Sequence, residues 1–349
     1  MASTIEVLSW SSLTAAVNEI KSPNQFLKKL VFGHHETQPT ESIEFGVFTG
    51  DREIAPFIER DGEAIPVSGY GETFQTVMPP NIRIKRPIKP SELLFNRAPG
   101  TVIFAPSADV IVSAAEAHIA RDAKRLADMA TNSEEYLCAL AIRGVISYVA
   151  ADEANFTITI PKPSGNNITL SVFWDDVAND PAADFKTAKS VISEAVGLGV
   201  TDVVLGSEAA AAFLASDSVK ALLDNRNISA GNIDLQQQYR DDGALFLGRF
   251  CGVNVWEYAR TVKVGGVSTA LIRAKYAEFL AVTPQAENTL YYGAIPDLDA
   301  FQGRLFQAER FSKSWTIPDP SSMQMLLHTR PLPIPRRPGS MVSMKVVSG

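Results

Sequence analysis

The segment from residue 41 to residue 97 sorts its charges along the chain, and this pattern constrains the fold more than any other. Residues 41–72 carry eight acidic residues against Arg52 and Arg60, whereas residues 81–97 carry five basic residues against Glu92. The acids are Glu41, Glu44, Asp51, Glu53, Glu59, Asp61, Glu63 and Glu72, and the bases are Arg83, Lys85, Arg86, Lys89 and Arg97.

Apolar and polar residues alternate at 43–47 and at 82–85, and glycines and a Pro79-Pro80 pair interrupt the segment between them. This pattern predicts two irregular β arms in a hairpin-like segment over residues 43–88. An arm of about 15 residues at ~3.3 Å each reaches roughly 50 Å, farther than a domain of this size needs for its own packing. We therefore expect this segment to pair with other chains.

Composition indicates a globular protein with a substantial core. The chain has 349 residues, of which 46% are hydrophobic, and its mean hydropathy is +0.02. A net charge of −7 argues against a surface that binds nucleic acid throughout, while leaving room for a locally basic face. Cys138 and Cys251 lie far apart among apolar residues, which favours buried free thiols in a reducing compartment. We expect no membrane-spanning segment and no signal peptide.

The longest helix signal covers residues 108–130, with Ser107 as N-cap. Two overlapping capping boxes at 131–135 predict that the helix either restarts there or continues to Gly144. The whole unit would be roughly 50 to 60 Å long at ~1.5 Å per residue.

An α/β pattern follows. Strands are predicted at 155–160, 168–173, 201–205, 253–256, 269–272 and 278–282, with a further strand at Leu245, and helices at 184–196 and after Gly206-Ser207-Glu208. Prolines alternate near the C-terminus, so residues 330–338 are predicted to form an extended polyproline-type segment.

Residues suited to catalysis are scarce. His34-His35 lacks other ligands at metal spacing and is interpreted as an exposed pair. His118 precedes Asp122 by one helical turn, which favours a hydrogen bond on the helix surface over a catalytic dyad. Gly197 and Gly199 precede a strand, whereas a dinucleotide-binding loop follows one. We assign no catalytic, cofactor-binding or metal-binding residue.

The basic arm at 83–97 has two interpretations. A line of cations attracts phosphate, but Phe95 is the only aromatic residue among them, and an acidic segment of comparable charge lies nearby in sequence. Charge-complementary contacts between protomers are therefore favoured over nucleic acid.

Five stretches occur in an order that suggests a known family. They are residues 54–60 (Ile-Ala-Pro-Phe-Ile-Glu-Arg), residues 74–92 with a Pro-x-Ile-x-x-Lys run, residues 201–206 (Thr-Asp-Val-Val-Leu-Gly), residues 311–315 (Phe-Ser-Lys-Ser-Trp), and the path through Asp319-Pro320 to residues 331–333. With these stretches the chain resembles lambda-type tailed-phage major capsid proteins of the capsid protein E family, which have the Hong-Kong-97 fold.

The resemblance implies an α+β fold with the family's domains. These would be an N-arm (1–45), an extended β loop (46–98), a peripheral domain containing the long spine helix (99–179 and 289–349, ending in a C-terminal strap) and an α/β axial domain (180–288).

The resemblance also implies a function. Such a protein would assemble as hexamers and pentamers into the icosahedral head of a tailed phage around packaged double-stranded DNA, without catalysis or a cofactor. It would be found in the virion after assembly in the host cytoplasm. Its further partners would be a portal, a small decoration protein and a separate scaffolding protein, since the sequence begins without a long charged helical leader.

Within this scheme, the extended loop should lack partners in its own chain, and the long helix, with balanced charges, should face the shell interior. The candidate inter-subunit contacts are Phe57, Arg60, Arg83, Lys85, Arg86, Lys89, Arg97, Arg330, Arg336 and Arg337. Two alternatives remain at this point: an encapsulin-like bacterial compartment shell, and an α/β enzyme with a site in residues 180–288.

Overall fold

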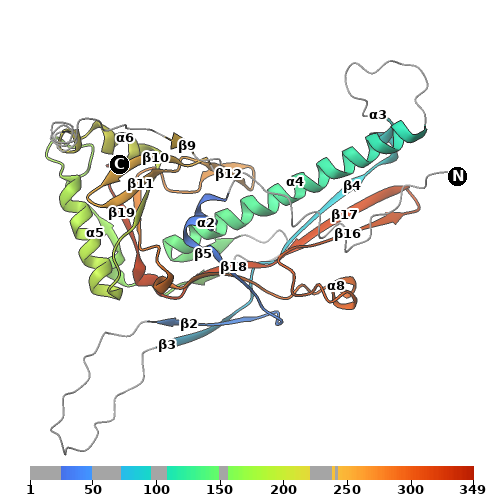
Figure 1. Cartoon of the computed structure of the whole chain (residues 1–349), viewed down its shortest axis with the longest axis horizontal. Helices are drawn as coiled ribbons and strands as arrows, with labels where there is room; N and C mark the ends of the chain where they lie inside the picture. The colour runs from blue at the N-terminus through green and yellow to red at the C-terminus, as the bar shows by residue number, and fades with distance from the viewer. Residues whose placement is uncertain (1–24, 49–71, 96–107, 149–155, 221–237, 240–242) are drawn as a thin grey trace, which may run out of the picture.

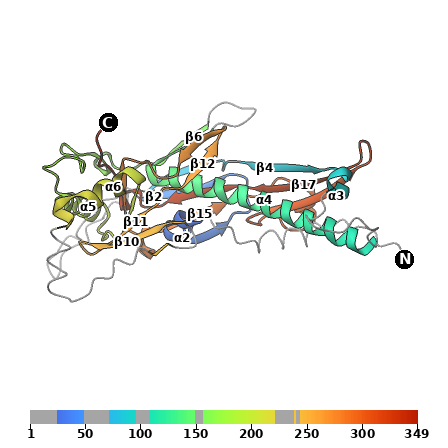
Figure 2. The same cartoon turned by 90° about the horizontal axis from the view of Figure 1, so that it is seen from above.

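A single long helix, α4 (Ala108–Arg143), organises the molecule. In the computed structural model, which describes residues 25–48, 72–95, 108–148, 156–220, 238–239 and 243–349, α4 runs from an α/β end to the opposite tip (Figures 1 and 2). Its 36 residues correspond to roughly 54 Å at ~1.5 Å per residue. The predicted helix is confirmed, and it continues without interruption through residues 131–135.

The burial of α4 changes along its length. From His118 to Ala130, the buried residues recur every three or four positions, so one side packs inward and the other is exposed. From Glu134 to Ile142, all residues but Tyr136 are buried. The helix therefore lies on a sheet in its first part and passes into the protein core in its last part.

The sheet beside the first part of α4 has the strand order β16-β17-β4. Its strands are β4 (Ile82–Ile88), β16 (Phe311–Ile317) and β17 (Ser322–Thr329), all antiparallel. Met325 and Leu327 of β17 form a cluster with Ile119 and Leu126 of α4. The basic arm thus belongs to this sheet. Strand β4 pairs along its whole length with β17 and, in the strand order of the described residues, with no strand of the acidic arm.

The acidic arm forms its own hairpin. Strands β2 (Ile43–Phe48) and β3 (Glu72–Val77) pair antiparallel, and this two-stranded ribbon projects from the body in the direction away from the outer end of β4 (Figure 1). Residues 49–71, which connect the two strands, are outside the described part.

The α/β end contains a mixed seven-stranded sheet in the order β7-β19-β14-β8-β11-β10-β9. Its strands are β7 (Asn167–Thr169), β8 (Asp202–Leu205), β9 (Gln238–Tyr239), β10 (Leu245–Phe250), β11 (Val253–Glu257), β14 (Tyr276–Leu280) and β19 (Met341–Lys345). Most of the sheet comes from residues 180–288, but β7 and β19 enter it from either side of that range.

Two helices accompany this sheet, α5 (Pro181–Val196) and α6 (Ser207–Ala215). Helix α5 begins at Asp180, whose carboxylate accepts the backbone N–H groups of Ala182 and Ala183, and it ends at Gly197 in the left-handed conformation. Gly206 precedes α6 where a side chain could not fit, because a Cβ atom would lie 2.1 Å from the Arg273 carbonyl oxygen.

A third sheet of three strands has the order β1-β15-β18. It consists of β1 (His34–Thr37), β15 (Asn288–Tyr292) and β18 (Pro331–Pro335). The predicted polyproline-type segment is therefore wrong, because residues 331–335 form a strand paired antiparallel with β15. A strand accepts prolines at alternate positions when it is outermost, since their missing N–H groups point away from the partner strand.

Shorter elements complete the fold. They are α2 (Phe26–Val31), α3 (Pro90–Phe95), α8 (Leu298–Gln302), the pair β5 (Val145–Tyr148) and β6 (Phe156–Thr159), the pair β12 (Thr261–Val264) and β13 (Val267–Ala270), and 3-10 turns at Ser164–Asn166, Pro284–Ala286 and Pro338–Ser340. The strands predicted at 155–160 and 168–173 are present in shortened form, and they pair with β5 and β19.

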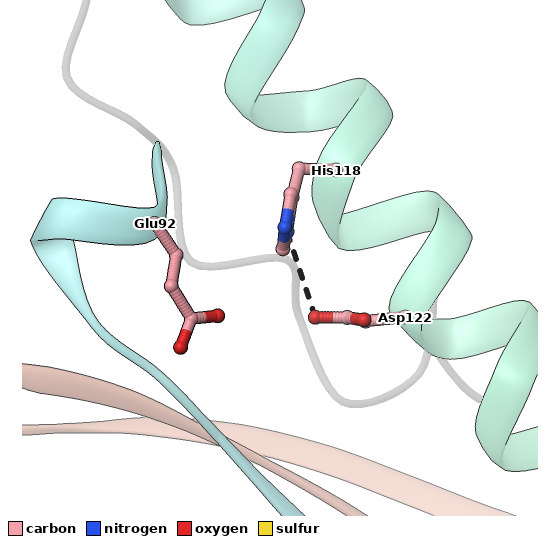
Figure 3. Close-up of side chains that lie close together, drawn as sticks. All are labelled: Glu92, His118 and Asp122. Atoms are coloured by element: carbon pink, nitrogen blue, oxygen red, sulfur yellow. Dashed lines mark ion pairs between the residues drawn. The ribbon is translucent and has the colours of Figure 1, made fainter. Parts of the chain in front are cut away.

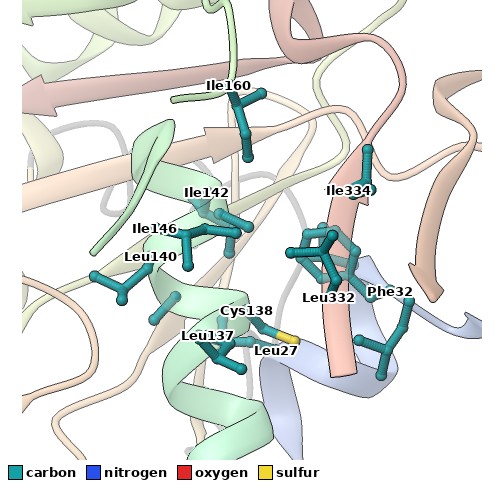
Figure 4. Close-up of a cluster of buried hydrophobic side chains, with 14 of the residues drawn as sticks. Leu27, Phe32, Leu137, Cys138, Leu140, Ile142, Ile146, Ile160, Leu332 and Ile334 are labelled. Atoms are coloured by element: carbon teal, nitrogen blue, oxygen red, sulfur yellow. The ribbon is translucent and has the colours of Figure 1, made fainter. Parts of the chain in front are cut away.

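The last turns of α4 lie in the main hydrophobic core. Figure 4 shows Leu137 and Ile142 of this helix surrounded by side chains of α2, β5 and β18. Cys138 is buried here, as predicted, and burial raises the pKa of its thiol. The prediction for Cys251 is wrong: this residue is exposed, because it lies in the tight turn between β10 and β11.

Two adjacent glutamates of α4 hold polar groups inside this core. Glu134 is fully buried and contacts Lys28 Nζ at 2.9 Å and Arg310 Nη2 at 2.8 Å. Burial alone would raise the pKa of Glu134, but the two cations outweigh burial and the pKa is lowered. Glu135 accepts the backbone N–H groups of Leu27 and Lys28, at 2.6 and 3.0 Å, and the Tyr258 hydroxyl at 3.0 Å. It therefore caps α2 from another helix.

Replacing Glu134 should strongly destabilise the subunit. Glu134→Gln leaves Lys28 and Arg310 buried with their shared counter-charge removed, and breaking a buried pair in this way costs about 3–5 kcal/mol. Urea unfolding of unassembled subunits measures the change. Asp217→Asn, which removes a carboxylate that is 99% exposed, is the control and should leave the midpoint unchanged. An unchanged midpoint for Glu134→Gln would contradict the prediction.

Glu135 should make stability depend on pH. Burial raises its pKa from 4.5 to about 7, and its hydrogen bonds oppose this only in part. The folded state then holds a proton that the unfolded chain releases, so this stabilisation is fully present below pH 4.5 and is lost as the pH rises through about 7.

Relative to Glu135→Gln, the wild type should therefore lose roughly 3 kcal/mol of unfolding free energy across this window. Urea titrations at several pH values test this, with the half-exposed Glu208→Gln as the matched control. Parallel pH profiles for wild type and Glu135→Gln would contradict the expectation.

Candidate inter-subunit surfaces

Five of the basic residues proposed to contact other subunits have partners in their own chain, although the pair of Arg83 with Asp297 is long, at 3.9 Å. Arg86 Nε lies 3.2 Å from Asp122 Oδ2, and its Nη2 lies 3.2 Å from Glu92 Oε2. Arg330 is 6% exposed, and its Nη1 donates to the Ala294 carbonyl oxygen at 2.8 Å. The expectation that the extended loop lacks partners in its own chain is thus wrong for the whole of β4, which pairs with β17, and for the Arg86 side chain.

Arg336 and Arg337 converge on one carboxylate. Their guanidinium groups lie 3.0 and 4.0 Å from Glu287, and both stand over the Phe48 ring, at 5.2 and 5.4 Å from its centroid. The physical reason is that β18 ends beside β2, where the Phe48 N–H donates to the Arg336 carbonyl oxygen. These two arginines tie the hairpin to the body.

Arg83, Lys85 and Lys89 remain as basic residues that face outward. Arg83 and Lys85 occupy the exposed positions of β4, and Lys89 follows the strand. The Arg83 side chain is 55% exposed, and its nearest acid, Asp297, is 3.9 Å away. Within the described residues, Lys85 and Lys89 make no ion pair. Phe57, Arg60 and Arg97 lie outside the described residues, so their contacts stay predictions.

A cleft of about 520 Å³ opens on the same outward face. It is lined by Arg83, Asp299, Lys313, Ser314 and Trp315. Lys313 Nζ lies 2.8 Å from Asp297 and 2.7 Å from Asp299, and although burial would lower the pKa of Lys313, these carboxylates raise it. The cleft therefore combines fixed charges with an aromatic wall.

Projecting elements also expose large apolar side chains, which the sequence analysis missed. Phe74 on β3 is 73% exposed, Val267 on the β12–β13 hairpin is 67% exposed, and Leu298 and Phe301 on α8 are 80% and 69% exposed. Single exposed apolar residues are ordinary, but here they recur at the ends of elements that extend from the body. The sequence contains a signal that could have made Phe74 a candidate contact residue: it is a single aromatic residue between the polar Thr73 and Gln75.

The exposed side of α4 is more basic than the sequence suggested. Arg121, Lys124 and Arg125 are exposed, whereas Asp122 is buried on the opposite side. The predicted balance therefore does not hold at Asp122, whereas Asp128 is partly exposed and Glu116 lies outside the side chains that the structure describes. His118, expected to bond with Asp122 at the helix surface, is also buried, because this side of α4 faces β4 and α3. His34 and His35 are exposed on β1, as predicted.

Solved structures show which known fold this arrangement matches. A capsid protein from a prophage of Escherichia coli CFT073 has a TM-score of 0.73 at 16% identity, with 98% of this chain and 99% of that chain covered. A phage-related protein from Bordetella bronchiseptica RB50 has a TM-score of 0.56 at 12% identity, with 97% of each chain covered. The mature capsid protein of bacteriophage PhiM1 has a TM-score of 0.51 at 12% identity, covering 93% and 88%.

The α+β fold expected from the sequence is thereby confirmed as a Hong-Kong-97-type capsid fold. A search of curated protein sequences found no match. Among the helices that the structure describes, none has the length and apolar character needed to cross a membrane.

The family described as phage major capsid protein E matches residues 9–346, which is nearly the whole chain. This match decides against the α/β enzyme that the sequence left open, because the family consists of structural proteins of the virion. With its fold and its sequence in agreement, the chain belongs to the phage major capsid protein E family.

Proposed function

We propose that this chain forms the icosahedral head of a tailed double-stranded DNA phage, in hexamers and pentamers joined by the sorted charges of residues 41–97. One observation carries the proposal: the acidic hairpin and the outward basic residues of β4 extend from their junction at residues 78–81 toward different ends of the molecule (Figure 1). In the sequence the acidic residues lie mostly on the hairpin side of this junction and the basic residues on the β4 side, so opposite charges of different chains can pair, and complementarity then selects the correct partner and register.

Strand β3 supports this proposal through its exposure. Ile43, Phe45 and Val47 of β2 are buried in the main core, whereas β3 leaves Phe74 73% exposed. A neighbouring copy that covers Phe74 would bury an aromatic side chain, which is the kind of residue that dominates interface energies. The cleft beside Trp315 offers an aromatic side chain, and the exposed face of β4 offers basic side chains. These features are complementary to Phe74 and to the acidic residues of a neighbouring hairpin.

The domain map follows the family. In this proposal residues 1–45 form an N-arm, residues 46–98 the extended loop, residues 99–179 and 289–349 the peripheral domain with its C-terminal strap, and residues 180–288 the axial domain. The exposed side of α4 faces the packaged DNA, where a few cations such as Lys124 and Arg125 give weak contact without regard to sequence. Assembly takes place in the host cytoplasm with a portal, a separate scaffolding protein and a decoration protein.

The family match favours a phage head over the encapsulin-like compartment, which would use a similar shell. The nucleic acid content of purified particles separates the two. Particles that carry protein cargo in place of double-stranded DNA would contradict the phage head.

Reversing the outward basic residues should block assembly. Arg83→Glu, Lys85→Glu and Lys89→Glu together should leave a folded subunit, since these side chains are exposed, but should abolish particles in electron micrographs. Arg86 is left unchanged because it neutralises Asp122 and Glu92 within the chain. Adding Glu59→Lys, Asp61→Lys and Glu63→Lys to the same chain should restore particles. Normal assembly of the first variant, or no restoration by the second, would contradict charge pairing between subunits.

Phe74 should matter for assembly and not for folding. Phe74→Ser removes an exposed ring, so the unfolding free energy of the unassembled subunit should change by less than about 0.5 kcal/mol. The yield of particles in sedimentation should nevertheless fall several-fold. Val177→Ser, at a fully exposed position outside the hairpin, is the matched control and should assemble as the wild type does. Equal yields for the two variants would show that Phe74 is not at an interface.

A further inference from the structure

Three potential metal ligands converge where α3 meets α4. His118 and Asp122 lie one turn apart on the same side of α4, and Glu92 approaches them from α3 (Figure 3). One ligand atom from each of the three residues lies within 4.8 Å of the other two. A spacing of four residues on a helix places two ligands on one face, as in known zinc-binding helices.

The distances between donors suit a small divalent ion. His118 Nδ1 lies 3.5 Å from Asp122 Oδ2. Two ligands of a tetrahedral zinc ion, bonded at about 2.0–2.1 Å, are roughly 3.3 Å apart. The helix therefore presents these two donors close to the required separation, and Glu92, whose side chain is about one-third exposed, completes the set by a small movement.

His118 supplies an independent indication of a ligand. The residue is 8% exposed, and its buried Nδ1 atom makes no hydrogen bond, since its one charged neighbour, Asp122 Oδ2, lies 3.5 Å away without hydrogen-bond geometry. A buried polar atom without a hydrogen bond is unfavourable, and native structures rarely contain one without a reason. Figure 3 shows the ring directed toward the two carboxylates, so an ion held between them would satisfy this nitrogen.

The charges of the cluster leave room for a cation. Two carboxylates face one guanidinium, Arg86, which contacts Asp122 Oδ2 and Glu92 Oε2 at 3.2 Å each. With a neutral imidazole, these four groups sum to one negative charge. Arg86 contacts Asp122 through Oδ2, the oxygen that also faces His118 Nδ1, so it competes with an ion for this ligand, although each carboxylate keeps a second oxygen that Arg86 does not contact.

We propose that Glu92, His118 and Asp122 bind a divalent transition metal of the zinc class. One imidazole nitrogen with carboxylate oxygens suits zinc better than magnesium or calcium, which prefer oxygen ligands throughout. The bound ion joins α3, at the end of the basic arm, to α4, across the 25 residues that separate Glu92 from His118 in the sequence. It therefore fixes the base of the extended loop on the long helix.

Zinc binding to the full-length chain tests the proposal. Unassembled chains stripped with EDTA are titrated with ZnCl2 by calorimetry, and Co²⁺ is used as a spectroscopic probe. We expect one saturable site per chain, a higher melting temperature with Zn²⁺, and no such shift with MgCl2. His118→Leu should weaken binding at least tenfold, and His34→Leu, at an exposed histidine on β1, is the matched control. Because these readouts come from single chains, they do not depend on the proposed assembly.

Arg86→Gln separates a metal site from a plain salt-bridge cluster. In a metal site, removal of this competing cation should tighten zinc binding several-fold, although the variant without metal melts at a lower temperature. In a salt-bridge cluster, the variant is destabilised and zinc does not restore it. If His118→Leu fails to fold, Glu92→Gln replaces it in the binding test, since this variant too should weaken zinc binding at least tenfold. A wild type without one-to-one binding, or unchanged binding in His118→Leu or Glu92→Gln, would overturn the proposal.

Discussion

The rest of the structure depends on the ionic contacts buried around Glu134 and Glu135. Glu134 joins Lys28 of α2 to Arg310, the residue before β16, and Glu135 receives the free N–H groups at the start of α2. Two neighbouring residues of α4 thereby position one helix and one strand that are distant in sequence. Buried polar contacts of this kind are seldom the most stable solution, but Glu134 requires cations and Glu135 requires hydrogen-bond donors, so together they specify one arrangement.

This specificity explains how the long helix α4 can join two different parts of the molecule, the sheet β16-β17-β4 and the main hydrophobic core. In its first half α4 packs on a sheet through apolar residues such as Ile119 and Leu126 and through the ion pair of Asp122 with Arg86. In its second half the network at Glu134 fixes the helix along its axis. The sheet β16-β17-β4 is tied to the same network through Arg310, so the basic arm keeps a fixed position relative to the core.

The sequence predicted the elements with strong local signals. The long helix, the helix over 184–196 and the alternation in β2 and β4 were all predicted from residues close in the chain. Prediction from the sequence failed where the residues that contact an element are distant in the chain. Nothing near β4 reveals that it pairs with β17, some 240 positions later, and nothing near His118 reveals that Glu92 and Arg86 will enclose it. The alternating prolines of β18 were misread because their local preference is extended, and only β15 makes them a strand.

Strand β18 has a consequence for how copies of this chain meet. Its three prolines, Pro331, Pro333 and Pro335, occupy the positions whose backbone groups point away from β15. The side of the strand away from β15 therefore has carbonyl oxygens but no N–H donors, and a further strand could form at most half of the usual ladder there. All five residues of β18 are also buried within the chain, so this edge is both covered and chemically unsuited to accept a strand from another copy.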